Sequence, residues 1–434
     1  MRWIVDRCSA AWRKGLQVVY RIGVVLYRYE YFRLSDFLIR VHLYGTGQAD
    51  LVRTRNTNFC PNQSDYGAFE RSFRAFLDER WRNWTAGRID LPIFLKESEP
   101  TPDLARLKDL RVLVITPRYR NSSALYLEND FIDHYYRSLI NIGVDAHIFY
   151  ADGICYPAIF RLDPLKALSD LAQLRQTVAQ IRPEVILFDG NFVGAEGSLS
   201  ASYLAEIKDS FGPKLVAFVI DAWGNLGIDA VNYWAPVSDL VVHTAPGGDA
   251  ERKNIFQKKL WCSAVPNNER IFFPQADRST DISFFGSYGT YLRAFWFGRV
   301  KMTVRRLGLR GDIHTSSLTK DGPAMPEYAA IMRASRMVMN CSSRSQAIRI
   351  MTHRVWQAIR SGVVLLEEEN EATRTSFIPF IHYVPFENAV QLDHMVEFFV
   401  KNPDCADRIG QAAAEFSARH YSAAQIWARL FMRI

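Results

Sequence analysis

Residues 110–116 read LRVLVIT, a continuous apolar run with the length of a β-strand. A polar loop, a helix-compatible stretch at 131–142 and a second strand-like run at 145–150 follow it. Short apolar runs that alternate with helices are typical of a parallel sheet buried on both faces. The series continues with a helix at 165–181 and strands at 184–189, 214–221 and 240–244. The pattern predicts a doubly wound α/β domain whose ligand crevice lies at the carboxyl ends of the strands.

A second series of the same kind begins at residues 281–286, which read DISFFG. Strands are expected at 281–286, 312–316, 337–341, 363–367 and 383–385, and helices at 291–307, 328–334, 352–361, 389–400 and 404–432. The fold class is therefore α/β, with two tandem Rossmann-like doubly wound domains and an N-terminal helical extension. We expect the extension and a linker at 1–105, a first lobe at 106–270 and a second lobe at 271–434. The cleft between two such lobes is a favoured ligand site.

Composition and charge exclude several classes of protein. A chain of 434 residues with 48% hydrophobic and 13% aromatic residues is too apolar to be disordered. The net charge is +7, and residues 1–45, with eight basic and three acidic side chains, supply most of it. The nearly neutral remainder contains no RNA- or DNA-binding module, which argues against a nucleic-acid partner. The six cysteines form no close pair, so neither a zinc site nor a disulfide framework is expected, and a cytoplasmic location is the default.

The N-terminal extension carries Arg7, Lys14, Arg21 and Arg28 at seven-residue spacing, which places them on one stripe of a helix. This helix either packs on the protein or on a second subunit, or it lies on an anionic membrane surface at the inner face of the membrane. No run of about 20 apolar residues, the length needed to span a bilayer, occurs in residues 1–45. Another helix is expected at 65–84, and the prolines between 91 and 103 predict a linker.

Gly286 and Ser287 lie where the first strand of the second lobe ends and its helix begins. Small residues at this point let a phosphate approach the backbone and the helix N-terminus, whose N–H groups favour anions. Arg293, one turn into that helix, could reach back over the same crevice. The alternative is a plain tight turn without a ligand.

Residues 340–369 read NCSSRSQAIRIMTHRVWQAIRSGVVLLEEE, a strand, a polar loop that includes Ser342, a short helix and a further strand. Thr352 is the expected N-cap of the helix, and Arg354 and Gln357, three apart, share one helix face. Arginine suits a diphosphate and glutamine suits ribose hydroxyls, although the two could also form a solvent-exposed face. Three glutamates, 367–369, end this stretch. They are expected to be exposed to solvent, or one of them, Glu368, contacts sugar hydroxyls.

The second series resembles the donor-binding lobe of group 1 (family 4-like) GT-B glycosyltransferases, and most closely their spore-maturation-type branch. The resemblance rests on the F-x-G-S pattern at 284–287, on Arg293, on the R-x-F-E-A-x-A-x-G-like segment 354–362 and on the closing segment 402–421. It covers roughly residues 108–434 and implies a hexosyltransferase-type enzyme with a nucleotide-sugar donor and a glycan, lipid-linked or protein acceptor. It also implies retention of anomeric configuration. No cofactor or metal is expected, since D-x-D is missing and a helix dipole with arginines can neutralise a leaving diphosphate.

The chain departs from this family at the E-x7-E pair, which would fall on Arg349 and Gln357. This departure favours a competing class, a non-catalytic GT-B-like binding or scaffold protein with a decayed donor site. In the first lobe, Asp221 and His243 follow or end strands and are the candidates for contact with an acceptor hydroxyl. A lone aspartate or histidine at a strand end can equally be a capping residue.

Overall fold

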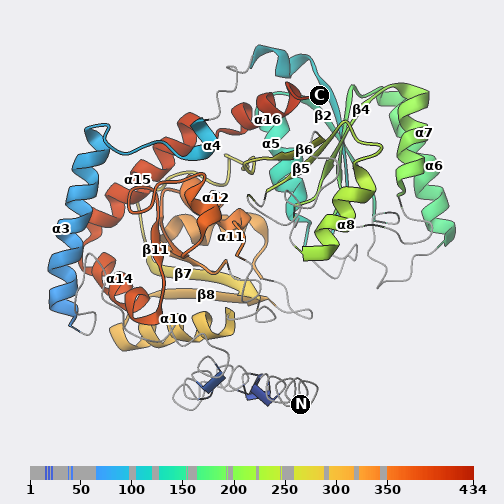
Figure 1. Ribbon diagram of the computed structural model, residues 1–434. Helices are drawn as coiled ribbons and strands as arrows, with labels where there is room; N and C mark the ends of the chain where they lie inside the picture. The colour runs from blue at the N-terminus through green and yellow to red at the C-terminus, as the bar shows by residue number, and fades with distance from the viewer. Residues whose placement is uncertain are drawn as a thin grey trace, which may run out of the picture.

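The computed structural model describes residues 65–96, 104–119, 127–152, 164–191, 199–220, 224–244, 259–287, 293–316, 322–342 and 349–434, with isolated positions elsewhere. Two parallel sheets, each flanked by helices, form two lobes (Figure 1). The described residues include no helix that is long and apolar enough to cross a membrane. Most of residues 1–45 lies outside the described residues, including Arg7, Lys14 and Arg28 of the expected basic stripe, whereas Arg21 is helical and exposed.

The first lobe contains a six-stranded parallel sheet in the order β2-β1-β3-β4-β5-β6. Its strands are β1 (Arg111–Thr116), β2 (Asp145–Tyr150), β3 (Val185–Asp189), β4 (Lys214–Phe218), β5 (Leu240–His243) and β6 (Leu260–Cys262). The first five confirm the sequence-based expectation: β1, β3, β4 and β5 are apolar runs buried almost throughout, and β2 is exposed at both of its ends. Strand β6 was not expected, since it has only three residues and all of them are partly exposed.

Helices cover both faces of this sheet. They are η4 (Ile132–Arg137), α5 (Ser138–Asn141), α6 (Pro164–Ile181), α7 (Ala201–Phe211) and α8 (Gly224–Trp234). The helix expected at 131–142 is present, but its first part, η4, is a π-helix. Such wide turns are rare and occur often at functional sites. In this turn the polar side chains of Asp133 and His134 are buried.

The second lobe contains a five-stranded parallel sheet in the order β11-β10-β9-β7-β8. Its strands are β7 (Thr280–Ser287), β8 (Gly311–Ser316), β9 (Ser335–Asn340), β10 (Val364–Glu368) and β11 (Val384–Phe386). The helices between them are α10 (Arg293–Leu307), α11 (Met325–Ala334), α12 (His353–Arg360), α13 (Glu371–Arg374) and α14 (Ala389–Lys401). The two sheets confirm the predicted α/β class with two Rossmann-like domains.

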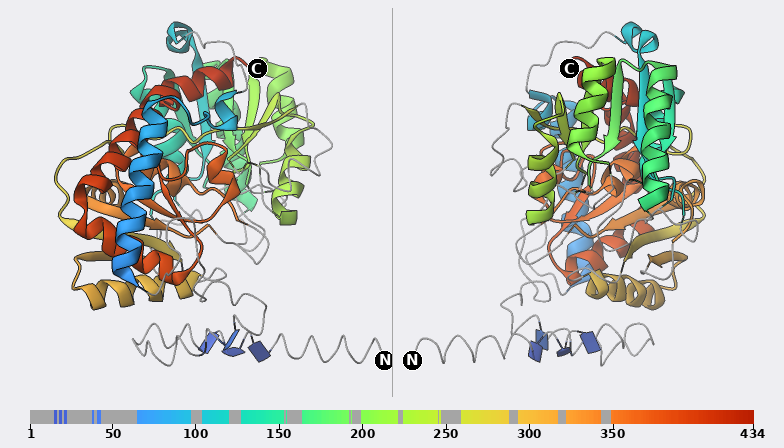
Figure 2. Two further views of the ribbon diagram at one scale, coloured as in Figure 1. Left: turned by 60° about the vertical axis from the view of Figure 1, so that its left-hand side comes forward. Right: turned by 90° about the vertical axis from the view of Figure 1, so that its right-hand side faces the viewer.

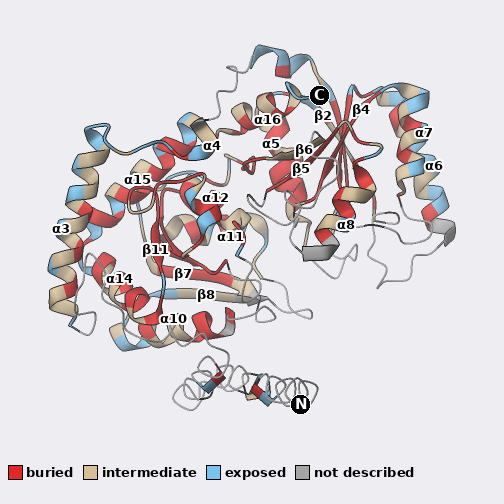
Figure 3. Cartoon of the chain, in the orientation of Figure 1, coloured by how far each residue is buried: buried red, intermediate tan, exposed pale blue. Residues whose placement is uncertain are grey.

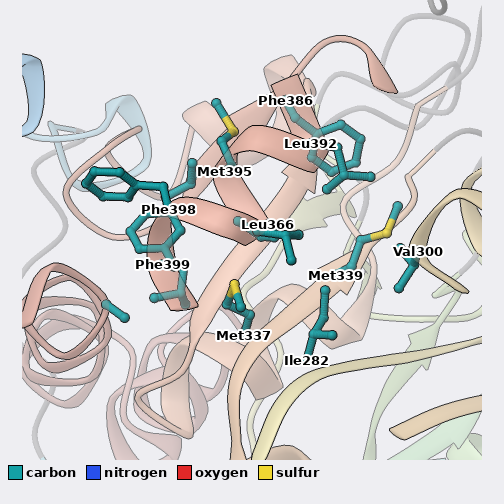
Figure 4. Packing of buried hydrophobic residues seen from close by; sticks show 14 of the residues in the cluster. Ile282, Val300, Met337, Met339, Leu366, Phe386, Leu392, Met395, Phe398 and Phe399 are labelled. Atoms are coloured by element: carbon teal, nitrogen blue, oxygen red, sulfur yellow. The ribbon is translucent and has the colours of Figure 1, made fainter. Parts of the chain in front are cut away.

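Apolar side chains from both sheet and helices fill the second lobe. Ile282, Met337, Met339 and Leu366 from the strands meet Phe398 and its neighbours on α14 (Figure 4). Figure 3 shows the buried residues concentrated on the strands and on the inner faces of the helices. The lobe is thus a packed layer of sheet between helices, and its polar site lies at the strand ends.

Helix α3 (Tyr66–Thr85), expected at 65–84, belongs to the core of the second lobe. Asp65 caps it by accepting from the backbone N–H groups of Gly67 and Ala68. Its inner face adds Phe69, Phe73 and Leu77 to the second-lobe core. Figure 2 shows the helix lying along the second lobe. The segment expected to be only a linker at 91–103 contains a short helix, α4 (Ile93–Lys96).

The prediction of a single closing helix at 404–432 is wrong. The chain forms α15 (Pro403–His420) and α16 (Ala423–Phe431), separated at Tyr421. Ser422 starts the second helix with a capping box to Gln425, an S-x-x-Q signal that the sequence contains. Helix α15 packs on the second lobe, whereas α16 places Trp427 in the core of the first lobe. The closing segment therefore joins both lobes.

Candidate functional site

The second sheet has a switch point between β7 and β9. The chain passes from β7 to β8 on one side and then returns across to β9 on the other. In open α/β sheets, ligands bind at the carboxyl ends of the strands beside such a point. Gly286 and Ser287 end β7, and Asn340 ends β9. The candidate site therefore lies around these three positions.

Gly286 and Arg293 lie close together at the β7 end. A Cβ atom on Gly286 would lie 3.3 Å from the Phe284 ring and 3.9 Å from Cδ of Arg293. Arg293 begins α10 and is only 8% exposed. A side chain at position 286 would therefore crowd the Phe284 ring, whereas its contact with Arg293 would be an ordinary one. The backbone of Ser287 ends the strand, and its side chain lies outside the described residues.

Asn340 links the β9 end to α12 and to β10. Its Oδ1 accepts a hydrogen bond from Nη1 of Arg354 at 2.6 Å and one from Oγ1 of Thr352 at 3.3 Å. Its Nδ2 donates to Oε2 of Glu367 at 2.8 Å. Thr352 occupies the expected N-cap position, but its side chain makes no capping bond to the helix backbone. Its hydroxyl contributes to the Asn340 cluster instead.

The acidic run at the carboxyl end of β10 is not solvated, so that expectation is wrong. Glu367 and Glu368 are buried, and Glu369 forms a bidentate ion pair with Arg374. Burial raises the pKa of Glu367 to about 8, and the charge of Glu368 adds to the effect, while the bond from Asn340 opposes it. A carboxyl group protonated at neutral pH thus lies at the end of the sheet.

Ser342 and Arg349 surround Glu368. The hydroxyl of Ser342 donates to the backbone oxygen of Glu368 at 3.4 Å, and the thiol of Cys341 donates to Oε2 of Glu368 at 3.3 Å. The exposed Arg349 places Nε 3.9 Å from Oε1 of the same glutamate. These three predicted site residues therefore form one cluster beside the Asn340 network.

Gln357 lies apart from this cluster, at the contact between the lobes. It is only 4% exposed, so the alternative that it belongs to a solvent-exposed helix face is wrong. Its Oε1 accepts from the Tyr328 hydroxyl at 2.7 Å, and its Nε2 lies 2.9 Å from Nε2 of His134 on η4. Arg354 points to β9 and Gln357 to the first lobe, so the two have no shared partner in these bonds.

The His134 imidazole is neutral in this contact. The amide nitrogen of Gln357 can only donate, so Nε2 of His134 must accept. Burial lowers the pKa of His134 to about 4, although the charge of Asp130 opposes the shift. Next to it, Nδ2 of Asn268 donates to Oδ1 of Asp133 at 3.0 Å. Sequence reasoning missed His134 and Tyr328, and the buried polar π-helical turn is the signal that locates the former.

Of the two first-lobe candidates, His243 alone lies among the described residues. His243 ends β5, is buried, and its carbonyl accepts from the backbone of Ser263. Asp221 lies outside the described residues. Asp189, another aspartate at a strand end, accepts from the backbone and side chain of Asn191 at 3.1 and 2.8 Å, as a capping residue does.

Comparisons with known proteins concern the fold and the second lobe. HepE from Anabaena, solved with UDP-glucose, is 10% identical over 74% of this chain and 99% of its own, with a TM-score of 0.45. A glycosyltransferase from Rickettsia africae is 10% identical over 75% and 97%, with a TM-score of 0.49. Sucrose-phosphate synthase from Thermosynechococcus elongatus is 10% identical over 75% and 98%, with a TM-score of 0.48.

No curated protein matches the chain in sequence. Residues 293–432 match a family model described as glycosyl transferase-like. The matched segment contains Arg293, Arg349, Arg354, Gln357 and Glu368. The particular spore-maturation-type branch stays a prediction. Residues 293–432, which supply most of the second lobe, are thus similar in sequence to glycosyl transferase-like domains.

Proposed function

We propose that the protein is a GT-B fold glycosyltransferase that moves a sugar from a nucleotide diphosphate donor to an acceptor. The observation that supports it most is the position of Arg354 in the glycosyl transferase-like segment. Its guanidinium lies at the start of α12 and bonds to the neutral amide of Asn340, while its Nε has no hydrogen-bond partner among the described residues. A cation held in this way can bind phosphate oxygens.

The proposed chemistry needs charge neutralisation more than it needs a protein nucleophile. Arg354, Arg293 and the N–H groups at the start of α12 would stabilise the leaving diphosphate without a metal. The departing diphosphate oxygen would take the proton from the acceptor hydroxyl, and the configuration at the anomeric carbon would be retained. Glu368 and Ser342, at the β10 and β9 ends, are the proposed contacts for sugar hydroxyls. The acceptor is a glycan, a lipid-linked sugar or a protein.

Replacing Arg354 by alanine is expected to weaken the binding of a nucleoside diphosphate by about 1.5–3 kcal/mol, which raises its Kd about 10- to 150-fold. The nucleoside without phosphates should be affected little, because it offers the arginine no anion. Isothermal titration calorimetry with UDP, GDP, dTDP and ADP identifies the nucleotide base that the protein prefers. The nucleoside with that base is then titrated in the same way. Arg305→Ala, at an exposed position on the same lobe, is the control and should leave both affinities unchanged.

The same titration tests metal independence. Binding should persist in chelator and gain nothing from magnesium. Loss of binding in chelator with recovery in magnesium would contradict the metal-free proposal. Equal weakening of nucleoside and diphosphate by Arg354→Ala would show that the arginine does not contact phosphate.

One observation favours the competing function, a binding or scaffold protein. Gln357, at the position of a family glutamate, is engaged by Tyr328 and His134 from two sides. A scaffold would bind nucleotide sugar and not consume it, whereas a transferase also hydrolyses its donor slowly in the absence of acceptor. Release of nucleoside diphosphate from the tightest-binding nucleotide sugar therefore distinguishes the two.

We also propose that the protein is cytoplasmic and attaches peripherally to an anionic membrane through residues 1–45. Each basic side chain near such a surface contributes about 1 kcal/mol, so several together give reversible attachment. The full chain should float with phosphatidylglycerol-containing vesicles, and a form without residues 1–60 should not. A variant with Arg7, Lys14, Arg21 and Arg28 replaced by glutamine is the matched control. Equal flotation of all forms would remove this proposal and leave packing or self-association.

A further inference from the structure

Glu367 has a place in the second lobe that the proposed function does not use. It is fully buried at the carboxyl end of β10, opposite Asn340 of β9 in the sheet register. Its Oε2 accepts from Nδ2 of Asn340 at 2.8 Å. A carboxyl group is costly to bury, so a buried one at the site edge calls for a role.

The bond to Glu367 sets the orientation of the Asn340 amide. An asparagine side chain donates at one end and accepts at the other, so an Nδ2 that faces Glu367 turns Oδ1 toward α12. On that side Oδ1 accepts from Arg354 at 2.6 Å and from Thr352 at 3.3 Å. Glu367 thus acts on the guanidinium through a single intervening side chain.

The protonation state of Glu367 decides how much negative charge lies beside Arg354. The groups that act on Glu367 are Glu368 on the same strand, Arg354 on α12, and the amides of Asn340 and Asn370. Tyr383, before β11, also interacts with it and is neutral because burial raises its pKa. Burial raises the pKa of Glu367 to about 8, so near neutral pH most of the carboxyl is uncharged.

We propose that Glu367 is a positioning residue of the donor site, which in its protonated form orients Asn340 and leaves the charge of Arg354 for the donor diphosphate. The inference rests on the proposed function, because it assigns the diphosphate to Arg354. Ionised Glu367 would instead attract the guanidinium and compete with the phosphate oxygens. The proton on Glu367 and the nucleotide diphosphate therefore bind with positive coupling.

The coupling predicts a pH dependence of a definite sign. A ligand that binds only the form with protonated Glu367 loses affinity as the pH rises through about 8. Between pH 7 and pH 9 the Kd for UDP should rise about tenfold in the wild type, given that pKa. The phosphates of UDP are already ionised over this range, so the ligand itself contributes little.

Glu367→Gln is the principal variant, since an uncharged amide replaces an uncharged carboxyl and its oxygen can still accept from Asn340. UDP titrations at pH 7 and pH 9 should then give nearly equal Kd values. Glu369→Gln is the matched control from the same acidic run. Its partner is Arg374, so the tenfold change of the wild type should persist. Proton uptake on UDP binding at pH 8, measured in buffers of different ionisation enthalpy, should be present in the wild type and lost in Glu367→Gln.

Asn340→Asp gives an independent test that does not remove Glu367. A carboxylate there would pair with Arg354 directly, so UDP should bind more weakly than in the wild type already at pH 7. Equal pH dependence in the wild type and Glu367→Gln, or unchanged UDP affinity in Asn340→Asp, would overturn the inference and leave the proposed function in place. If none of the nucleoside diphosphates tested bound the wild type at either pH, the proposed function itself would fail.

Discussion

Replacement of Gly410 by alanine is expected to lower the free energy of unfolding by about 3 kcal/mol or more. Gly410 lies in α15 where this helix crosses the turn after α12. A Cβ atom there would lie 2.2 Å from the carbonyl oxygen of Gly362 and 2.9 Å from its carbonyl carbon. These are backbone atoms, so no side chain can rotate away to relieve the clash.

The turn at Gly362 cannot retreat easily either. Gly362 has a φ of +65°, and its carbonyl oxygen also accepts from Arg278 at 2.8 Å. Urea unfolding measures the effect. Gly67→Ala in α3 is the control, because its Cβ would meet only side-chain atoms at 3.4 Å or more, and alanine favours a helix. Similar stabilities for both variants would contradict the close approach of α15 to the turn.

Replacement of Gln357 by glutamate should be the second most damaging change, at about 3 kcal/mol near pH 8.5. The new carboxylate could still accept from Tyr328, but its other oxygen would face an Nε2 of His134 that also accepts. To donate to this oxygen, neutral His134 would have to move its ring proton from Nδ1 to Nε2, and the charge would be buried without a counter-ion. The variant that restores the usual glutamate of the family is thus expected to destabilise the contact between the lobes.

The pH dependence of this loss has a predictable sign. In the wild type, burial lowers the pKa of His134, so its contribution to stability is present above the ordinary pKa and lost as pH falls toward about 4. In the variant, the carboxylate would raise the pKa of His134. In the variant, the stabilising contribution of protonated His134 is complete below the ordinary pKa of histidine. It is lost as the pH rises through the raised pKa of His134. The difference in stability between the two proteins should therefore narrow from pH 8.5 to pH 6.

Urea unfolding of both proteins at several pH values measures this difference. Gln411→Glu adds the same charge at an exposed position of α15 and should change stability by less than about 0.5 kcal/mol at every pH. A constant deficit in the Gln357 variant between pH 6 and pH 8.5 would mean that His134 does not take up the proton.

The architecture could be predicted from the sequence because the central strands, such as β3 and β10, are buried on both faces and leave apolar runs. The candidate positions at the strand ends followed from that order. The partner of Gln357 could not be predicted, since His134 lies 223 residues away and a contact of this range leaves no local pattern. The burial of Glu367 was also missed, because three consecutive glutamates normally indicate solvent. The fixed register with Asn340, known only once the strands are paired, explains it.

The path of the chain has a consequence for synthesis on the ribosome. Helix α3, made before the first lobe, completes the core of the second, and α16, made after the second lobe, completes the core of the first. Trp427, with its indole bonded to Ser138, reaches that core only once nearly all the described residues are made. Domains commonly fold one after another as they emerge. In this chain the first lobe cannot be finished before the second has been made, so its final packing should come last although it is made first.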